Sequence, residues 1–577
     1  MSEGNQTKLY PILAFLSMFL LIYPTIRLGL DVTDTGFHLT NQMLANHLGI
    51  EFIKIMPFWW MTDMIGGLWL RAIDSLWGAR LAGVLIYSSI AMLSVLLVQR
   101  VYKPHWIICL AIVASGMFSY SSCMINYETI PLLLYVLFSL FFLQIHYTPE
   151  RKLYACLCGV LLAILPFTRM PMVLTFFLPV LTISIAAYYK QAKRILSSYL
   201  AMYIVSLLTL LSIAFYLWTQ GLLFEYLFYK SPSSVHVVDK LIVLYAKQVL
   251  GRIPFLTLLF GVPLLLYWMS KRKLLSLYSF GALLLFTYGL SLLHTNLLLP
   301  FRSDEKLYML LFFILSLLGV VSIYLQRKTI SLQEVLLFFL GIMMPLLFVA
   351  GSASGFPRTQ IGMWLLGAIV ANLLMRNIPH LSLPKAGPPL YLINSLFLLC
   401  LGCYGVKIVY FNTPRDASHA ELICRLESAR LAGIYTTSPR KESFDALVAE
   451  VVKNSHPLDP ILAYHAIPLL YYATHTVPVG NHSWLTVLPS EVLKKIVEGF
   501  SENAPPSLIV RSKTHTDRPD WGLKSIQVTI TDDYLEELEN IEIIDQAIQA
   551  KWDLSLVWSN ADFDLYKPTA KSSVELH

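Results

Sequence analysis

Long apolar runs constrain the fold of this sequence more than any other feature. Hydrophobic residues make up 56% of the 577 residues and charged residues only 14%, whereas soluble domains average about 25% charged residues. A helix needs about 20 mostly apolar residues to cross a bilayer, and about 13 runs approach that length. The runs lie at 9–28, 81–99, 105–122, 128–145, 153–167, 171–189, 198–217, 253–269, 274–293, 306–325, 331–350, 360–375 and 389–409. The sequence therefore predicts a polytopic α-helical membrane protein.

Basic residues set the expected orientation of these helices. With the N-terminus in the cytoplasm, every loop on that side carries at least a basic pair, as the positive-inside rule requires. The residues are Arg100, Lys103, Arg151, Lys152, Lys190, Lys193, Arg194, Lys271, Arg272, Lys273, Arg327, Lys328, Arg376 and Lys385. An odd number of crossings places the segment after residue 410 outside. We expect a bacterial inner membrane, since the sequence shows no retrieval signal for the endoplasmic reticulum. The net charge of +7 is spread over these loops and indicates no nucleic-acid partner.

The chain divides into two expected parts. Residues 1–409 form a transmembrane module, and residues 410–577 are long enough for an extracytoplasmic soluble domain. Strand-like stretches alternate there with helical spacing, which predicts a small α/β domain. The outer loops 29–80 and 218–252 mix aromatic and charged residues, a composition typical of helices that lie in the membrane interface.

One polar stretch, at residues 31–38, follows the first apolar run directly. It holds Asp31, Asp34 and His38 where the chain leaves the predicted membrane. Ionisable groups at that depth are costly, which favours a catalytic or binding role. The alternative is that both carboxylates cap the helix that begins near Phe37, and a single histidine at the start of a helix is more often structural.

Cationic side chains on the predicted outer face are candidates for holding a phosphate, because the guanidinium group of arginine matches phosphate geometry. They are Arg80, Arg169, Lys230, Arg252, Arg302, Lys306 and Arg358. Arg358 ends the small-residue loop 351–357, whose N–H groups could approach an anion closely. Each cation taken singly could equally extend from a helix end into the interface. Glu128, at the outer end of the predicted fourth span, is a further candidate acid or an ordinary interfacial residue.

These residues give the chain a resemblance to the GT-C superfamily of integral-membrane glycosyltransferases, in particular to the lipid A aminoarabinose transferases and protein O-mannosyltransferases. Four short motifs match in order: residues 34–38 resemble Asp-Glu-(Gly/Ala)-Tyr-Tyr, Pro57 a proline-aromatic turn, Arg80-Leu81 the Arg-Leu pair of the second span, and Arg169-Met170-Pro171 a basic-x-Pro. Thr35 stands where many members have a second carboxylate, and His38 where many have tyrosine. A metal site of adjacent carboxylates is therefore incomplete unless Asp31 supplies the missing acid.

The resemblance implies a GT-C-like fold and an inverting transfer of a hexose or pentose from a polyprenyl-phosphate donor to a lipid, glycan or protein acceptor. Asp34 would be the general base, with Asp31 and Glu128 as further acids. His38 and the cations would bind substrate or phosphate. A divalent metal is the one cofactor left open. Two alternatives remain: a cell-envelope oligosaccharide polymerase or ligase, and a lipid-linked-sugar flippase or transporter, although the span centres carry little charge.

Overall fold

The computed structural model of the whole chain describes most of its residues. They are 3–103, 105–120, 123–227, 238–250, 305–352, 354–377, 398, 401–410, 415–514, 516, 521 and 532–571.

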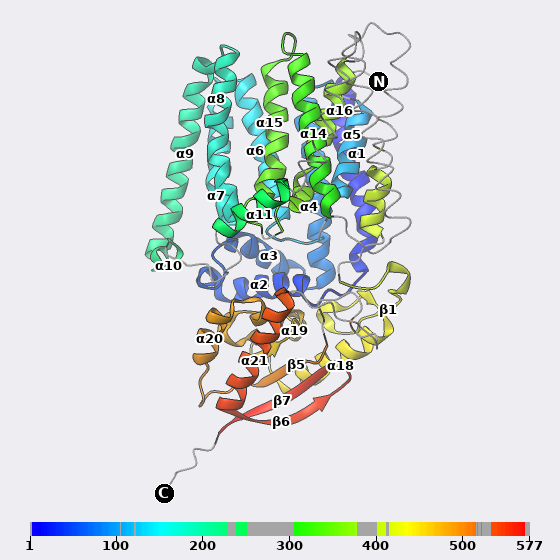
Figure 1. Cartoon of the computed structure of the whole chain (residues 1–577), viewed down its shortest axis with the longest axis vertical. Coiled ribbons are helices and arrows are strands. Elements are labelled where there is room, and N and C mark those ends of the chain that lie inside the picture. The colour runs from blue at the N-terminus through cyan, green and yellow to red at the C-terminus, as the bar shows by residue number, and fades with distance from the viewer. Residues whose placement is uncertain are drawn as a thin grey trace.

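The first part of the chain is a bundle of apolar helices (Figure 1). Its described helices are α1 (Glu3–Ile22), α4 (Leu76–Gln99), α5 (Trp106–Phe118), α6 (Thr129–Tyr147), α7 (Lys152–Thr168), α8 (Leu178–Tyr188), α9 (Ala192–Thr219), α14 (Glu305–Leu325), α15 (Leu332–Val349) and α16 (Leu366–Asn377). Local capping fixes several starts. The Ser75 hydroxyl accepts the Gly78 N–H at 3.0 Å before α4, and Ser331 and Glu334 form a capping box before α15.

The predicted helical membrane module is confirmed in outline, but the count of about 13 crossings is not. Six of the described segments are long and apolar enough to cross a membrane. They are Lys8–Arg27, Leu76–Gln99, Thr129–Tyr147, Met170–Tyr188, Ala192–Thr219 and Leu332–Val349. Three predicted spans correspond to shorter helices, α5, α7 and α16, of 13, 17 and 12 residues. The predicted runs 253–269, 274–293 and most of 389–409 lie outside the described residues.

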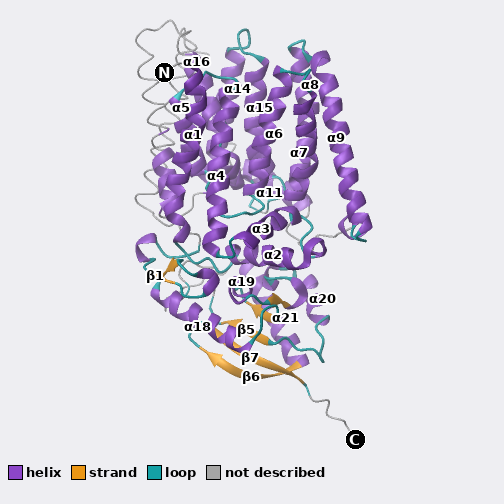
Figure 2. Cartoon of the chain, turned by 180° about the vertical axis from the view of Figure 1, so that it is seen from behind, coloured by secondary structure: helices purple, strands orange, loops and turns teal. Residues whose placement is uncertain are grey.

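A layer of short elements separates the bundle from the C-terminal domain (Figures 1 and 2). It contains α2 (Asp34–Leu48), the 3-10 helix η2 (Gly49–Lys54) and α3 (Trp60–Ala72), all within the loop expected at 29–80. The second expected loop, 218–252, contributes α10 (Leu223–Leu227) and α11 (Val238–Leu250). Helices α2 and α3 pack so closely that a Cβ on Gly66 would lie 2.3 Å from the Gln42 side chain. This layer carries the 31–38 stretch.

The C-terminal domain has the predicted α/β character. Its five-stranded mixed sheet has the order β4-β3-β5-β7-β6, parallel from β4 to β5 and antiparallel from β5 to β6. The strands are β3 (Pro460–Tyr464), β4 (Val477–Pro478), β5 (Leu508–Ser512), β6 (Trp552–Ser559) and β7 (Phe563–Ala570). The helices are α18 (Ser438–Asn454), α19 (Leu469–Thr474), α20 (Ser490–Glu498) and α21 (Asp532–Lys551), and β1 (Cys424–Arg425) pairs with β2 (Tyr435–Thr436).

One apolar core joins the layer to this domain. Val32 and Leu39 from the layer are fully buried in the same cluster as Leu470 and Phe563. The contact is close: the Leu469 N–H donates to the Val32 carbonyl at 3.0 Å, and a Cβ on Gly36 would lie 2.2 Å from the Leu469 nitrogen. The C-terminal domain therefore fixes the position of the first turn of α2.

Candidate active site

The two acids of the 31–38 stretch have different surroundings. Asp31 is buried, and its carboxylate accepts the N–H and hydroxyl groups of both Thr33 and Thr35 at 2.7–3.0 Å. These bonds satisfy N–H groups that the start of a helix leaves free. Asp34 begins α2, and 60% of its side chain is exposed. The helix-capping alternative therefore applies to Asp31, whereas the Asp34 carboxylate is accessible to a ligand.

Asp34 is accessible, yet protein surrounds it. The neighbouring protein groups displace bulk water from the carboxylate, and this desolvation raises the pKa of Asp34 from its usual 3.8 to about 6. Arg415 opposes the rise, the Asp31 charge adds to it, Arg358 lowers the pKa again, and Glu128 raises it. At neutral pH Asp34 is mostly ionised but remains a better proton acceptor than an ordinary aspartate.

His38, one turn further along α2, is buried and neutral. Burial lowers its pKa to about 4, although the charges of Glu128 and Asp31 oppose that shift. Its ring packs against Tyr127 at a centroid distance of 5.3 Å, and its Nδ1 has no hydrogen-bond partner among the described residues. His38 can therefore exchange a hydrogen bond with a ligand but does not supply a positive charge.

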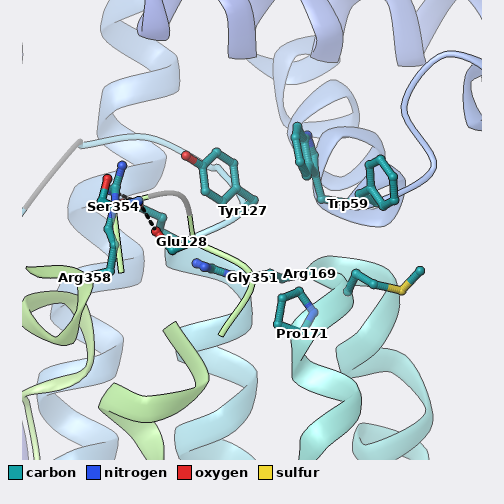
Figure 3. Close-up of a pocket in the computed structure, with 11 residues that line it drawn as sticks. Trp59, Tyr127, Glu128, Arg169, Pro171, Gly351, Ser354 and Arg358 are labelled. Carbon is teal, nitrogen blue, oxygen red and sulfur yellow. Dashed lines mark hydrogen bonds and ion pairs between the residues drawn. The ribbon is translucent and has the colours of Figure 1, made fainter. Parts of the chain in front are cut away.

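A cavity of about 390 Å³ lies between the bundle and the layer, and Tyr127, the ring that packs against His38, is among its lining residues (Figure 3). It is bounded by four chain segments that are remote in sequence. The lining residues are Phe58 and Trp59 before α3, Tyr127 and Glu128 before α6, Arg169, Met170 and Pro171 between α7 and α8, and Gly351, Ser352, Ser354 and Arg358 after α15. The cavity is thus built where the bundle helices end against the layer.

Arg169 provides the clearest ligand-binding feature of this cavity. It is 6% exposed, its Nη2 donates to the Phe348 carbonyl at 2.9 Å, and its guanidinium carbon lies over the rings of Phe348 at 4.9 Å and Tyr127 at 5.7 Å. Its Nη1 is buried without a hydrogen-bond partner among the described residues. An unpaired buried donor is costly, and more so on a charged group, so an anionic ligand would satisfy it.

Glu128 and Arg358 form an ion pair on another wall of the cavity (Figure 3). The Arg358 Nη1 lies 2.5 Å from Oε1 of Glu128, whose side chain is 6% exposed, whereas the Arg358 side chain is 38% exposed. Arg358 stands in the 3-10 helix η5 (Phe356–Gly362). Two glycines of the preceding loop, Gly351 and Gly355, have φ angles of 71° and 69°, which glycine adopts without strain.

The structure brings only part of the predicted set together. Glu128, Arg169 and Arg358 line the cavity. His38 packs against the lining residue Tyr127, and Asp34 is near enough to Glu128 and Arg358 for their charges to shift its pKa. Arg80 does not line it: its guanidinium donates to the carbonyls of Ile26, Leu28 and Gly29 at 2.7–3.1 Å and so braces the turn before Asp31. Lys306 belongs to α14, but its side chain is not described, and Lys230, Arg252 and Arg302 lie outside the described residues.

Sequence reasoning missed three residues of this region. Tyr127 stands next to the candidate Glu128, and Trp59 belongs to the aromatic loop, so both had a local signal. Arg415 had none: its Nη2 lies 3.0 Å from Oδ2 of Asp34, which is remote in sequence. Only the docking of the C-terminal domain reveals that contact.

The described residues do not form a metal-ligand set. No group of three or more His, Cys, Asp or Glu side chains among them could hold a metal ion. Asp31, the acid expected to complete such a site, uses its oxygens for hydrogen bonds within the chain. The divalent metal stays a prediction from the resemblance.

A second cavity, of about 340 Å³, lies where α2 and α3 end against the C-terminal domain. Its lining residues are Met43, Asn46, His47, Leu70, Arg71, Asp74, Arg430, Leu458 and His475. Arg430 pairs with Asp74 at 2.7 Å and donates to the Tyr472 carbonyl at 2.9 Å. Arg71 donates to the Asn46 side chain. The polar groups of this cavity therefore bond mainly to one another.

Comparison with known proteins gives matches among solved structures alone. No protein-family model matches the sequence, and no curated protein does. Two crystal structures of ArnT from Cupriavidus metallidurans match along nearly the whole chain. The apo structure covers 97% of this chain and 98% of its own, with 12% identity and a TM-score of 0.40. The structure bound to undecaprenyl phosphate covers 96% and 97%, with 12% identity and a TM-score of 0.39. At these scores the match assigns neither residues nor an activity.

Proposed function

We propose that this protein is a membrane-embedded glycosyltransferase that moves a sugar from a polyprenyl-phosphate donor to a lipid, glycan or protein acceptor. The observation that carries the proposal is the unpaired Nη1 of Arg169, buried in a cavity at the end of the apolar bundle. The resemblance of residues 34–38 to a GT-C motif supports it from a separate part of the chain, and residues 169–171 resemble the basic-x-Pro motif that contains Arg169.

The donor phosphate binds in the cavity between Arg169 and Arg358. Two guanidinium groups balance the negative charge of a phosphate, and each planar guanidinium can donate two N–H groups to phosphate oxygens. The Arg169 Nη1 thereby gains the partner that it otherwise lacks. The isoprenoid tail leaves past Met170, which is exposed at the cavity edge and begins an apolar segment that also exposes Val173 and Phe177. A lipid chain is favoured there, because this surface faces hydrocarbon when the segment spans a bilayer.

Asp34 acts as the general base in a single displacement. The acceptor oxygen attacks C1 of the sugar while Asp34 takes its proton, and the C1–O bond to phosphate breaks with its electron pair going to the phosphate oxygen. Arg169 and Arg358 stabilise the charge that develops on the departing polyprenyl phosphate. Attack opposite the leaving group inverts the anomeric centre, by analogy with single-displacement hydrolases.

Bond formation is the direct test. Purified protein in lipid nanodiscs is given a panel of radiolabelled polyprenyl-phosphate hexoses and pentoses, with an envelope lipid extract as acceptor. We expect release of polyprenyl phosphate and transfer of label to a new product of inverted anomeric configuration. A flippase would leave all label on the donor. Intact donors throughout the panel, with donor binding shown by native mass spectrometry, would rule out transfer.

A further inference from the structure

Arg415 connects the C-terminal domain to the candidate base. Its Nη2 lies 3.0 Å from Oδ2 of Asp34, and its Nη1 donates to the hydroxyl of Thr33, the residue before α2. The guanidinium carbon also lies 5.7 Å from the centre of the Trp484 ring. The other carboxylate oxygen of Asp34, Oδ1, accepts no hydrogen bond within the described part of the chain.

A buried ion pair holds Arg415 in place. Asp416 and Arg440 have side chains that are 0% and 1% exposed and meet at 2.8 Å. Arg440 also donates to the Arg415 carbonyl at 2.8 Å. Arg415 has a φ angle of 55°, a conformation that residues other than glycine rarely adopt and that persists where the surroundings impose it. The backbone of Arg415 is therefore positioned by the interior of the C-terminal domain.

The same ion pair also fixes the segment that leads to Asp34. The second carboxylate oxygen of Asp416 accepts the Leu30 N–H at 2.5 Å and the Thr436 hydroxyl at 2.9 Å. Leu30 lies shortly before Asp31 and Asp34 in the sequence, in the segment that leads into α2. One buried carboxylate thus anchors both the segment that leads to Asp34 and the residue next to Arg415.

The charged and titratable groups that face Asp34 come from four parts of the chain. Asp31 lies in the turn before α2, Glu128 and Tyr127 precede α6, Arg358 stands in η5, and Arg415 comes from the C-terminal domain. His38, on α2 itself, is neutral at physiological pH. Arg358 already contacts Glu128 at 2.5 Å. Among the described residues, Arg415 is the cation that contacts the Asp34 carboxylate directly.

We propose that Arg415 is a positioning residue for Asp34, through which the C-terminal domain completes the active site. Arg415 engages Oδ2 and thereby leaves Oδ1 as the oxygen that receives the acceptor proton. The inference builds on the proposed function, since it assigns Asp34 the role of base. The effect of Arg415 on the pKa of Asp34 can still be measured on the carboxylate itself, without any sugar donor.

The test follows the reaction of Asp34 with a hydrophobic carbodiimide, a reagent to which protonated carboxyl groups add. The full-length protein in nanodiscs is labelled across a pH series, and mass spectrometry quantifies the peptide that contains Asp34. In the wild type we expect half-maximal labelling near pH 6. Arg415→Gln removes the charge and should move the midpoint to higher pH, because the nearby cation favours the ionised carboxylate. Arg415→Lys keeps the charge and should stay close to the wild type, and Arg415→Met should repeat the shift of Arg415→Gln.

Arg430→Gln is the matched control, because it removes an arginine of the same domain that pairs with Asp74 instead. Its labelling midpoint should equal that of the wild type. An unchanged midpoint in both Arg415→Gln and Arg415→Met overturns the inference, whether or not the protein transfers sugar. A shifted midpoint supports it even if every donor stays intact, and that second result would count against the proposed function alone. If the protein transfers sugar, the acidic side of its pH–rate profile should move in the same direction as the labelling midpoint.

Discussion

The two cavities on either side of the α2–α3 layer have similar volumes, about 390 and 340 Å³, and both contain arginines. They differ in how those arginines are bonded. In the first, Arg169 keeps a buried Nη1 without a partner among the described residues. In the second, Arg430 contacts Asp74 and the Tyr472 carbonyl, and Arg71 contacts Asn46. The two cavities are similar in volume and both are lined by arginines. The unpaired N–H group of Arg169 is therefore what distinguishes the first cavity, as a candidate ligand site, from the second.

The largest expected effect comes from the candidate base. Asp34→Asn keeps the size of the side chain but removes proton acceptance, so transfer should fall by at least ~100-fold. The fold should survive, because the side chain is 60% exposed. Asp74→Asn makes the same change beside the second cavity and should retain transfer. Radiolabel transfer and thermal unfolding of both variants provide the measurement, and wild-type turnover by Asp34→Asn would refute the assignment.

The next effect contrasts the two arginines directly. Arg169→Gln should weaken donor binding by about 10- to 100-fold, the value of one or two hydrogen bonds to a charged group. Arg430→Gln should leave donor binding unchanged and lower the free energy of unfolding by at most about 1 kcal/mol, since its partner Asp74 is half-exposed. Titration with polyprenyl phosphate, followed by native mass spectrometry, measures the first effect, and chemical denaturation measures the second. Equal losses of donor affinity in both variants would remove the distinction between the cavities.

A smaller effect concerns pH. The base acts in its ionised form, and the pKa of Asp34 is about 6. Transfer should therefore be low under acidic conditions, reach roughly half of its maximum near pH 6, and level off above neutrality. His38, with a pKa of about 4, stays neutral over that range. Initial rates at saturating donor give the profile, and an acid limb near pH 4 would contradict the environment described for Asp34.

The smallest effect comes from the acid that shares the first cavity. Glu128 raises the pKa of Asp34 only weakly, as the last of five influences. Glu128→Gln should move the acid limb slightly to lower pH, opposite to the shift expected for Arg415→Gln. Its measurement needs closely spaced pH points and the carbodiimide midpoint as a second readout. A shift to higher pH would mean that Glu128 acts mainly by holding Arg358.

Residue type and predicted sidedness were sufficient to find part of the candidate site. Glu128, Arg169 and Arg358 lie far apart in the sequence yet line one cavity. Arg80 shows the limit of such reasoning, since an arginine at a helix start looks the same whether it meets a phosphate or three backbone carbonyls. The difference between Asp31 and Asp34 was also hidden, because which acid caps α2 depends on backbone geometry.

Fold class was more accessible to sequence than packing. Apolar runs predict helices that cross a membrane, but the run at 105–122 gave no sign that its helix, α5, has only 13 residues. The strand-like stretches at residues 461–464 and 507–511 correspond to the parallel pair β3 and β5. The pairing of Arg415 with Asp34 had no sequence signal, because it depends on how the C-terminal domain packs against the layer.

Gly36 has a consequence for how its motif should be interpreted. With hydrogen in place of a side chain, α2 approaches the backbone of Leu469 so closely that even a methyl group would overlap its nitrogen. Gly36 is therefore explained by the close packing of α2 against the C-terminal domain, without any contact to a substrate. A chimaera with a different C-terminal domain would have to reproduce this close contact at Gly36 to hold Asp34 in the same position.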